Sequence, residues 1–564
     1  MPMQGKKHYN EKLFVHFQLS AIVPEDNFYR RLKHILDLNF LYELTQPYYG
    51  NEGQKSIDPV VFMKLMLVGY FENLNSDRRI IDQSRLRLDI LYFLGYDIDE
   101  SLPWHSTLSR TRQLYGEAVF LEMFRRVLGM CVQAGMVGGK RQALDSAYIK
   151  ANASMDSLKE KSELEVLKQE VLHDAATYSK ELKANEDKEG NTKQKDEGPH
   201  DKSKLEVSRE KKKEVEAHHR WKEETYKDQP KGRIKSSEDT FEDELETDEQ
   251  RRGKYLSNYT HYSSTDPDSR VSTKPGKARA LNYTAQTSVD TQQHVITNIN
   301  ADYSDKRDSE CLATALNKTE ANLQAYGMKI KELLADAGYS SGSALKYLKF
   351  KGITAYIPNF GQYKAHREGF WYNEEKDQYE CERGNNAVLP YKRTLTDSKG
   401  YTKRIYRSDN SKCKDCPLRT SCIGKSDFKK IEDSIDKPYY DEMHRRLQTR
   451  RARLYKKLRS ATVEPVLGTL INFMGLRRIG SRGIKQANKY MLGAATAYNL
   501  KKWLRYVIRK SGAAAQQISP VGTNEAKKAS KGLLKIFDEY SILYSTIIQT
   551  KNHHHIIPYR VLYQ

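Results

Sequence analysis

Residues 280–302, ALNYTAQTSVDTQQHVITNINAD, are the stretch that decides the fold. Apolar and polar side chains alternate along 280–290 and again along 294–302, and a short turn separates the two runs. Alternation with a period of two is typical of a half-buried strand, because successive side chains point to opposite faces of a sheet. Two such runs around a turn predict a β-hairpin.

The segments around this hairpin alternate between strand and helix patterns. They are, in chain order, the extended segment RQALDSAYIKA (141–151) with Asp145, an amphipathic helix at 305–326, a strand at 329–335 that ends at Asp336, a helix at 342–349 and a strand at 353–358. Alternating strands and helices predict an α/β fold with a mixed sheet.

Residues 1–138 have helical patterns, and Asp58 with Pro59 is typical of an N-cap followed by proline at the first helical position. A short helix, TLSRTRQLY (107–115), follows a break and would be capped by Ser106. It resembles the second helix of a helix-turn-helix, and its base-facing candidates are Thr107, Ser109, Arg110 and Gln113. A surface helix without a DNA role is the open alternative.

The charge of the chain points to a polyanionic partner. The 564 residues carry a formal net charge of +21, and Lys and Arg number 95. Such an excess is most often matched by nucleic acid, because neutralising phosphates releases counterions. No stretch has the length of a membrane span, no secretory signal is evident, and six cysteines do not make a disulfide scaffold. We therefore expect a soluble intracellular protein whose partner is a nucleic acid. A charge that serves solubility alone is the open alternative.

The positive charge is unevenly distributed. Residues 156–253 contain 22 Lys/Arg and 28 Asp/Glu, which predicts a solvated insertion that is partly helical and partly disordered. Apolar residues from Leu158 to about Lys183 permit a helix or short coiled coil there. In contrast, residues 443–510 contain 18 Lys/Arg and a single acid, Glu464.

Three carboxylates stand out in this distribution. Asp145 and Asp336 lie near strand ends, where ligands gather in α/β sheets, and Glu464 lies alone in a basic stretch. A lone acid facing phosphate is best explained by a divalent cation, and three carboxylates could hold two Mg²⁺ or Mn²⁺ ions. The alternative is an ion pair with Arg459 or Arg478. Because Pro465 disfavours the α conformation before it, Glu464 is expected at a helix start.

Four of the six cysteines suggest a second metal. Cys413, Cys416 and Cys422 form a C-x2-C-x5-C pattern, and 31 residues separate Cys381 from Cys413. Grouped thiolates in a loop-rich region predict a structural zinc site. Unligated reduced cysteines and an iron–sulfur cluster are the alternatives.

Four segments carry a family resemblance: DSAYIKANAS (145–154), ADAGYSSG (335–342), ATVEPVLGTLINFMGLRRIGSRG (461–483) and AYNLKKW (497–503). With them, the chain resembles the bacterial insertion-sequence transposases of the DDE type. The resemblance implies a helical DNA-binding domain followed by an RNase H-like mixed-sheet core. It implies that Asp145, Asp336 and Glu464 are the catalytic metal-binding triad.

The same resemblance implies DNA contacts near the last acid. Relatives carry a tyrosine–arginine–glutamate–lysine signature, for which Tyr455 and Arg459 are the matching candidates. Ile471 replaces the signature's lysine, so the basic role would pass to Arg477 or Arg478.

The expected domains are 1–138 (helical, DNA-binding), 139–155 with 270–358 (RNase H-like core), 156–269 (charged insertion), 359–440 (cysteine-rich, zinc-binding insertion), 441–510 (basic part carrying Glu464) and 511–564 (tail). The expected function is a transposase of the bacterial cytoplasm, associated with the nucleoid. It would bind terminal inverted repeats as a homodimer, cleave double-stranded DNA and join 3′-hydroxyl ends to target DNA. Two alternatives stay open: a catalytically inactive zinc-containing DNA-binding protein, and a metal-dependent nuclease without strand transfer.

Overall fold

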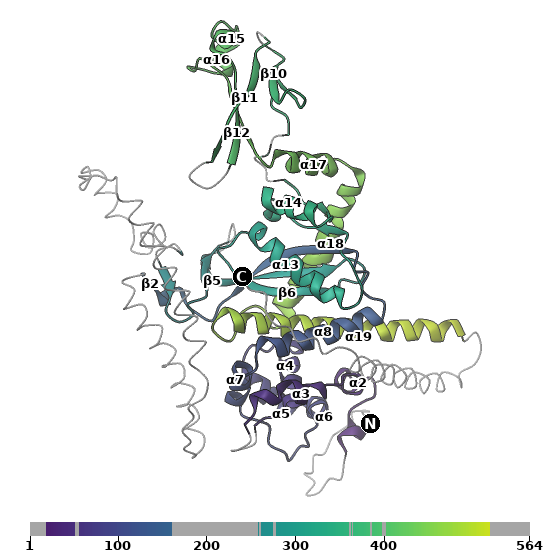
Figure 1. Ribbon diagram of the computed structural model, residues 1–564. Coiled ribbons are helices and arrows are strands. Elements are labelled where there is room, and N and C mark those ends of the chain that lie inside the picture. Colours follow the sequence, from purple (N-terminus) through teal and green to yellow (C-terminus); the bar gives the residue numbers. More distant parts are fainter. Residues whose placement is uncertain are drawn as a thin grey trace, which may run out of the picture.

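The computed structural model describes residues 18–50, 56–160, 258, 261–273, 278–359, 363, 365–383, 386–396 and 402–518. A six-stranded mixed sheet lies at its centre, with helices packed against it (Figure 1). Its strands are β1 (Arg141–Lys150), β4 (Arg270–Ser272), β5 (Ala280–Asp290), β6 (Ile296–Tyr303), β7 (Glu332–Leu334) and β8 (Thr354–Tyr356). The predicted hairpin at 280–302 is confirmed as β5 and β6, which pair antiparallel.

Strand β1 is central in this sheet. It pairs antiparallel with β5 along nearly its whole length and parallel with β7 on its other edge, and β8 continues the parallel part. The order is therefore β6-β5-β1-β7-β8, with β4 on the same edge of β5 as β6. This arrangement confirms the α/β mixed sheet that the sequence predicts.

Helices pack around this sheet. They are α13 (Asp308–Gln324), α14 (Gly342–Phe350), α17 (Lys437–Leu447), α18 (Arg450–Phe473) and α19 (Ile484–Ile518). The first two confirm the helices predicted at 305–326 and 342–349. One hydrophobic core joins β1, β5 and β7 to α13, α18 and α19, and it continues into the amino-terminal helices.

Helix α19 covers the outer edge of β6. The Asn499 side chain accepts a hydrogen bond from Ile296 N (3.0 Å) and donates one to Ile296 O (2.8 Å). Three turns earlier, the Asn488 side chain accepts from Ala301 N (2.8 Å). These amides supply bonds that a neighbouring strand would supply, so the edge strand is not left with open backbone groups.

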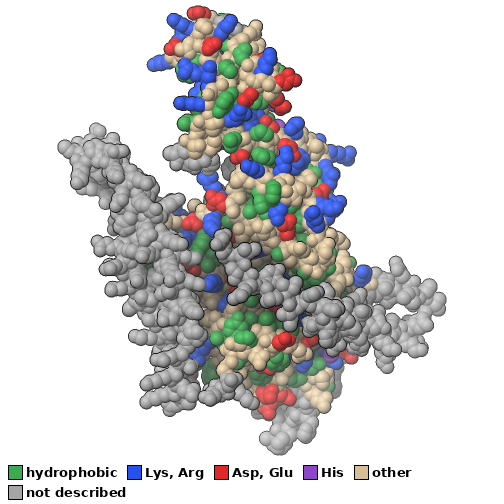
Figure 2. All heavy atoms as spheres, in the orientation of Figure 1, with side chains coloured by type: hydrophobic (Ala, Val, Ile, Leu, Met, Phe, Trp, Pro, Cys, Tyr) green, Lys and Arg blue, Asp and Glu red, His purple; other side chains and the backbone are tan. Residues whose placement is uncertain are grey.

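A separate five-stranded antiparallel sheet occupies most of the region that was expected to bind zinc. It contains β9 (Phe370–Asn373), β10 (Gln378–Cys381), β11 (Val388–Thr396), β12 (Thr402–Arg407) and β13 (Lys430–Ser434), with the short helices α15 (Asn410–Lys414) and α16 (Arg419–Cys422). Its small core is Tyr379, Leu389, Tyr406 and Ile431. Figure 2 shows Lys and Arg side chains on this sheet and over α17 and the start of α18.

Eight helices form the amino-terminal region of the described chain. They are α1 (Leu19–Ile22), α2 (Phe28–Ile35), α3 (Phe40–Thr45), α4 (Pro59–Phe71), α5 (Asp77–Leu86), α6 (Leu88–Leu94), α7 (His105–Leu114) and α8 (Glu117–Gln133). The predicted cap is confirmed, because the Asp58 side chain accepts from the backbone of Val60 and Val61. Helix α4 is buried nearly all round and packs against α19.

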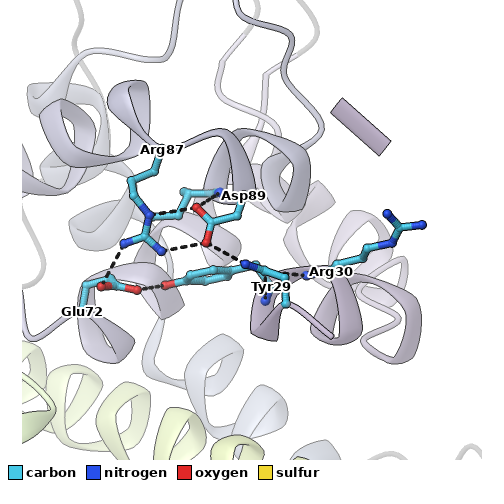
Figure 3. Close-up of polar contacts among 7 residues, drawn as sticks. Tyr29, Arg30, Glu72, Arg87 and Asp89 are labelled. Carbon is cyan, nitrogen blue, oxygen red and sulfur yellow. Dashed lines mark hydrogen bonds and ion pairs between the residues drawn. The ribbon is translucent and has the colours of Figure 1, made fainter. Parts of the chain in front are cut away.

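A polar network joins α2 to the end of α4 and to the start of α6 (Figure 3). Arg87 donates two hydrogen bonds to Asp89 (2.8 and 2.7 Å) and one to Glu72 (3.4 Å). The Tyr29 hydroxyl donates to Glu72 at 2.6 Å. Asn27, which caps α2, also donates to Asp89 at 3.1 Å. The cap of α2 is thereby fixed to the start of α6.

The charged insertion leaves the core through a short two-stranded sheet. This sheet pairs β2 (Leu158–Glu160) with β3 (His261–Ser263). The helix predicted from Leu158 is therefore wrong at its first residues, because the pairing with β3 holds them extended. The rest of that predicted helix lies outside the described residues, and so does the part of the insertion that was expected to be disordered. No helix among the described residues is both long and apolar enough to span a bilayer.

Candidate active site

Asp145 lies in the middle of β1, so the prediction that it lies near a strand end is wrong. The pairing with β5 holds the strand extended beyond it as far as Lys150. The cross-strand partner of Asp145 on β5 is Thr287, and only 15% of the Asp145 side chain is exposed. The carboxylate accepts a hydrogen bond from the backbone of Ser146 (2.8 Å). A strand that is paired on both edges holds this carboxylate rigidly.

The parallel register of β1 and β7 places Asp336 level with Asp145. Ala143 on β1 is paired with Leu334 on β7 in parallel, so the residues two positions farther along are Asp145 and Asp336. Asp336 then leaves the strand and caps the short helix η3 (Ala337–Tyr339) by accepting from Gly338 N at 3.0 Å. The structure therefore brings together the first two predicted acids.

Glu464 comes to these acids on α18, and Arg459 joins them. The Arg459 guanidinium donates to Asp145 (2.8 Å) and to Glu464 (3.1 Å). The ion pair with Arg459 that the sequence left as an alternative is thus present. Arg459 is largely buried, whereas 56% of the Glu464 side chain is exposed.

The predicted helix start at Glu464 is wrong. Helix α18 runs from Arg450 to Phe473 and contains Pro465 in its interior. Proline removes the hydrogen bond that its nitrogen would give to the carbonyl of Ala461. Ala461, Glu464 and Pro465 are all exposed, so water can satisfy that carbonyl.

The electrostatics of Asp145 fit a site for a cation. Burial raises the pKa of Asp145 to about 6, and the nearby charge of Asp336 adds to the rise. The Ser146 N–H and Arg459 oppose it without cancelling it. Two carboxylates that repel each other, and a third bridged to the first by a guanidinium, form a hard oxygen donor set that suits Mg²⁺. As placed, however, the described His, Cys, Asp and Glu residues form no group of three or more that could hold a metal ion.

Two family models match the chain. A transposase domain matches residues 17–114, and a transposase DDE domain matches residues 380–504. The chain belongs to the insertion-sequence transposases of the DDE type. A DDE domain implies an RNase H-like core, which agrees with the mixed sheet around β1. No curated protein and no solved structure matches the chain significantly.

The match to the DDE domain covers Tyr455 and Glu464. It begins at residue 380, after Asp145 and Asp336, and therefore does not include them. The structure places the Tyr455 hydroxyl against Arg141, Arg451 and Glu332. Arg141 and Glu332 open β1 and β7, so Tyr455 lies toward the opposite end of these strands from Asp336. Here its hydroxyl accepts from the two arginines that pair with the buried Glu332 and donates to that carboxylate, so it anchors the beginning of α18. Its predicted phosphate contact stays a prediction.

Arg477 and Arg478 lie in the loop between α18 and α19. This loop lies beside the last residue of β1, because Lys150 pairs with Arg478 as an isolated parallel bridge. The Arg478 side chain donates to Asn152 at 3.1 Å, and both arginines are exposed. They are thus positioned on the surface beyond the carboxyl end of β1, the strand that carries Asp145.

Helix α7 is the predicted DNA-reading helix of the transposase. It begins at His105 after Trp104, so the predicted cap by Ser106 is wrong. Arg110 is exposed and Gln113 half-buried, whereas Ser109 donates its hydroxyl to Asp77 at 2.5 Å. The buried Arg112 also pairs with Asp77 (2.5 Å), and Lys489 of α19 donates to the Arg112 carbonyl (2.9 Å).

The predicted zinc site is not supported. No disulfide joins the six cysteines, and Cys381, Cys413, Cys416 and Cys422 are not gathered into a group that could hold a metal. Cys413 is buried against the Ser408 hydroxyl (3.0 Å), whereas Cys422 is exposed. The region is held by its tyrosine core, where Tyr379 donates to Asp433 and Arg367 pairs with Asp433 at 2.8 Å.

Sequence reasoning missed three residues that lie beside the acids. Gln286, Asp308 and Tyr339 form a hydrogen-bonded chain behind Asp336. Tyr339 lies within ADAGYSSG (335–342), one of the segments that carry the family resemblance, so the sequence pointed to this turn but not to the tyrosine itself. Nothing in the sequence connects Gln286 with Asp308, because only the sheet brings them together.

Proposed function

We propose that this transposase cleaves DNA at the ends of its insertion sequence and joins the 3′-hydroxyl ends to target DNA. The observation that carries the proposal is that Arg459 joins Asp145 to Glu464, while the register of β1 and β7 brings Asp336 beside Asp145. This arrangement combines hard oxygen donors with a cation that can bind a phosphate.

Each residue has a distinct role in the proposal. Asp145, Asp336 and Glu464 would hold two Mg²⁺ or Mn²⁺ ions, which supply activation of water or a 3′-hydroxyl and stabilisation of the leaving oxygen. Arg459 turns from the carboxylates to the scissile phosphate, where its planar fork can donate two parallel hydrogen bonds. The rigid sheet keeps Asp145 and Asp336 fixed during the displacement, so the chain contributes chiefly positioning and electrostatics.

Exposed basic residues support DNA binding outside the site. On α17 and α18 these are Arg445, Arg450, Arg453, Lys456 and Lys457. Figure 2 shows Lys and Arg side chains over α17 and the start of α18. Arg477, Arg478 and Tyr455 would bind the DNA backbone near the cut, and Arg110 with Gln113 would read bases in the inverted repeat. Two ends must be held together for joining, so a homodimer is the proposed synaptic form, acting at the nucleoid in the bacterial cytoplasm.

The test uses labelled element-end DNA, Mg²⁺ and the full chain. Cleavage followed by strand transfer is expected, and Asp145→Asn or Glu464→Gln should lower both by at least about a thousandfold, or ~4 kcal/mol of activation free energy. Glu368→Gln is the matched control, because 85% of that side chain is exposed, in the turn that precedes β9 of the second sheet. Cleavage that survives Asp145→Asn would overturn the proposal.

The same assay separates the two alternatives. Binding of element-end DNA without any cleavage by the native chain would favour an inactive DNA-binding protein. Cleavage without joined products would favour a metal-dependent nuclease.

A further inference from the structure

The turn that carries Asp336 is fastened from behind by a buried tyrosine. Tyr339 is the last residue of η3, the turn that Asp336 caps, and its ring is fully buried. Its hydroxyl donates to the side-chain carbonyl of Gln286 on β5. Gln286 is also fully buried, and it pairs across the sheet with Ser146, the neighbour of Asp145. One side chain therefore links the Asp336 turn to the strand beside Asp145.

The next contact fixes the direction of the Gln286 amide. Its Nε2 donates to a carboxylate oxygen of Asp308 at 3.1 Å. Asp308 is the first residue of α13, where the helix N-terminus favours a negative charge. Because a carboxylate can only accept, the amide must present nitrogen to Asp308 and oxygen to Tyr339. Burial and the surrounding carboxylates also raise the pKa of Tyr339, which keeps its hydroxyl a donor.

Gly338 shows how little room the turn has. A Cβ on this glycine would lie 2.9 Å from an oxygen of Asp308 and 3.1 Å from an oxygen of Asp336. The Gly338 N–H also donates to Asp336. The backbone of Gly338 thus passes between the two carboxylates, and a larger residue would displace at least one of them.

We propose that Tyr339 and Gln286, held by Asp308, are positioning residues that keep the Asp336 carboxylate aligned for a divalent cation. The inference rests on the proposed metal-binding role of Asp336. It predicts that removing the Tyr339 hydroxyl loosens the turn without touching any metal ligand. Removing the hydroxyl also leaves the buried Gln286 oxygen without a hydrogen-bond donor, which costs free energy and weakens the link between the Asp336 turn and β5.

The test is direct binding of Mn²⁺ to the full chain, measured by calorimetry without DNA, beside cleavage at increasing Mg²⁺. Tyr339→Phe and Gln286→Met should each weaken Mn²⁺ binding about fivefold to tenfold, a free-energy change of ~1 to 1.4 kcal/mol. The Mg²⁺ concentration for half-maximal cleavage should rise by a similar factor, while cleavage at saturating metal changes by less than about threefold. The double variant should be no worse than the poorer single variant, because both break one chain of contacts.

Tyr347→Phe is the matched control. Its hydroxyl donates to Asn317 at 2.6 Å on the exposed surface of the nearby helix α14, so the same atom is removed outside the site. This variant should bind Mn²⁺ like the native chain.

Other outcomes decide between the two proposals. Should Tyr339→Phe fail to fold, Gly338→Ala tests the alignment of the Asp336 carboxylate without changing Tyr339, and it should also weaken Mn²⁺ binding. Native Mn²⁺ affinity in Gln286→Met and Gly338→Ala, with binding lost in Asp336→Asn, would overturn the inference and leave the proposed function intact. Native affinity in Asp336→Asn itself would overturn the proposed function.

Discussion

Arg459 donates to Asp145 across 2.8 Å and thereby joins α18 to the central strand of the sheet. The same guanidinium holds Glu464 at 3.1 Å. One cation from the chain thus sits between two acids that are proposed to share a metal. Its positive charge reduces the repulsion between the carboxylates. Arg459 therefore competes with any metal ion that would bind them.

Replacing this arginine should separate metal binding from cleavage. In Arg459→Gln, Mn²⁺ should bind about fivefold more tightly, because a positive charge worth ~1 kcal/mol of repulsion is removed. Cleavage should nevertheless fall by about a hundredfold, since the proposed phosphate contact is lost. Calorimetry and the cleavage assay measure the two effects. Lys346→Gln, which removes an exposed positive charge on α14, should alter neither. Weaker Mn²⁺ binding in Arg459→Gln would contradict this view.

Metal-free stability should depend on the protonation of Asp145. Burial raises its pKa to about 6, so the folded chain holds the proton more tightly than the unfolded chain does. The resulting stabilisation is fully present below about pH 4 and is lost as the pH rises through about 6. Asp145→Asn, which stays uncharged, should therefore unfold with a free energy higher than native by on the order of 2 kcal/mol at pH 8, and close to native at pH 4. Urea denaturation in a chelator measures the difference. A Glu368→Gln control should track the native curve, and destabilisation by Asp145→Asn at pH 8 would refute the prediction.

The docking of α19 on β6 should depend on one amide. Asn499 is fully buried and satisfies both backbone groups of Ile296. Asn499→Ala should lower the free energy of unfolding by about 2–4 kcal/mol, because a buried N–H and a buried carbonyl lose their partners. Asn472→Ala, an exposed site near the end of α18, should stay within about 0.5 kcal/mol of the native chain. Equal free energies of unfolding for the two variants would show that the Asn499 hydrogen bonds to the edge of β6 do not stabilise the chain.

The buried Arg112–Asp77 pair should behave as a unit that fixes α7 to α5. Only 1% of the Arg112 side chain is exposed, and its guanidinium also lies over the Tyr490 ring of α19. Arg112→Met should destabilise the chain by about 3–5 kcal/mol, since Asp77 is left buried without a counter-charge. Adding Asp77→Asn should recover part of this loss. Thermal unfolding provides the measurement, and the exposed Arg79→Met is the control. No recovery in the double variant would mean that packing, not charge, is lost.

Local patterns carried much of the fold. Alternation along 280–302 predicted the hairpin, because the side-chain period follows from backbone geometry. The strand end predicted at Asp145 was wrong, since β1 continues to Lys150. Asp145 comes beside Asp336 through the parallel register of β1 and β7. Pro465 misled the prediction for Glu464, since proline's lost hydrogen bond matters little where the helix faces water. The cysteine spacing misled in a similar way. Spacing says nothing of distance across a folded sheet, and here a tyrosine core fills the region.

The sequence by itself determined the chemistry available to this transposase: its basic charge, its isolated glutamate and its strand-borne aspartates. Only the tertiary structure decided which groups meet. Arg459 reaches Asp145, Asn499 closes the edge of β6, and Tyr339 reaches Asp308 through Gln286, although these residues are far apart in the chain. Such contacts depend on how elements pack, and packing is set by the whole core at once rather than by any local pattern.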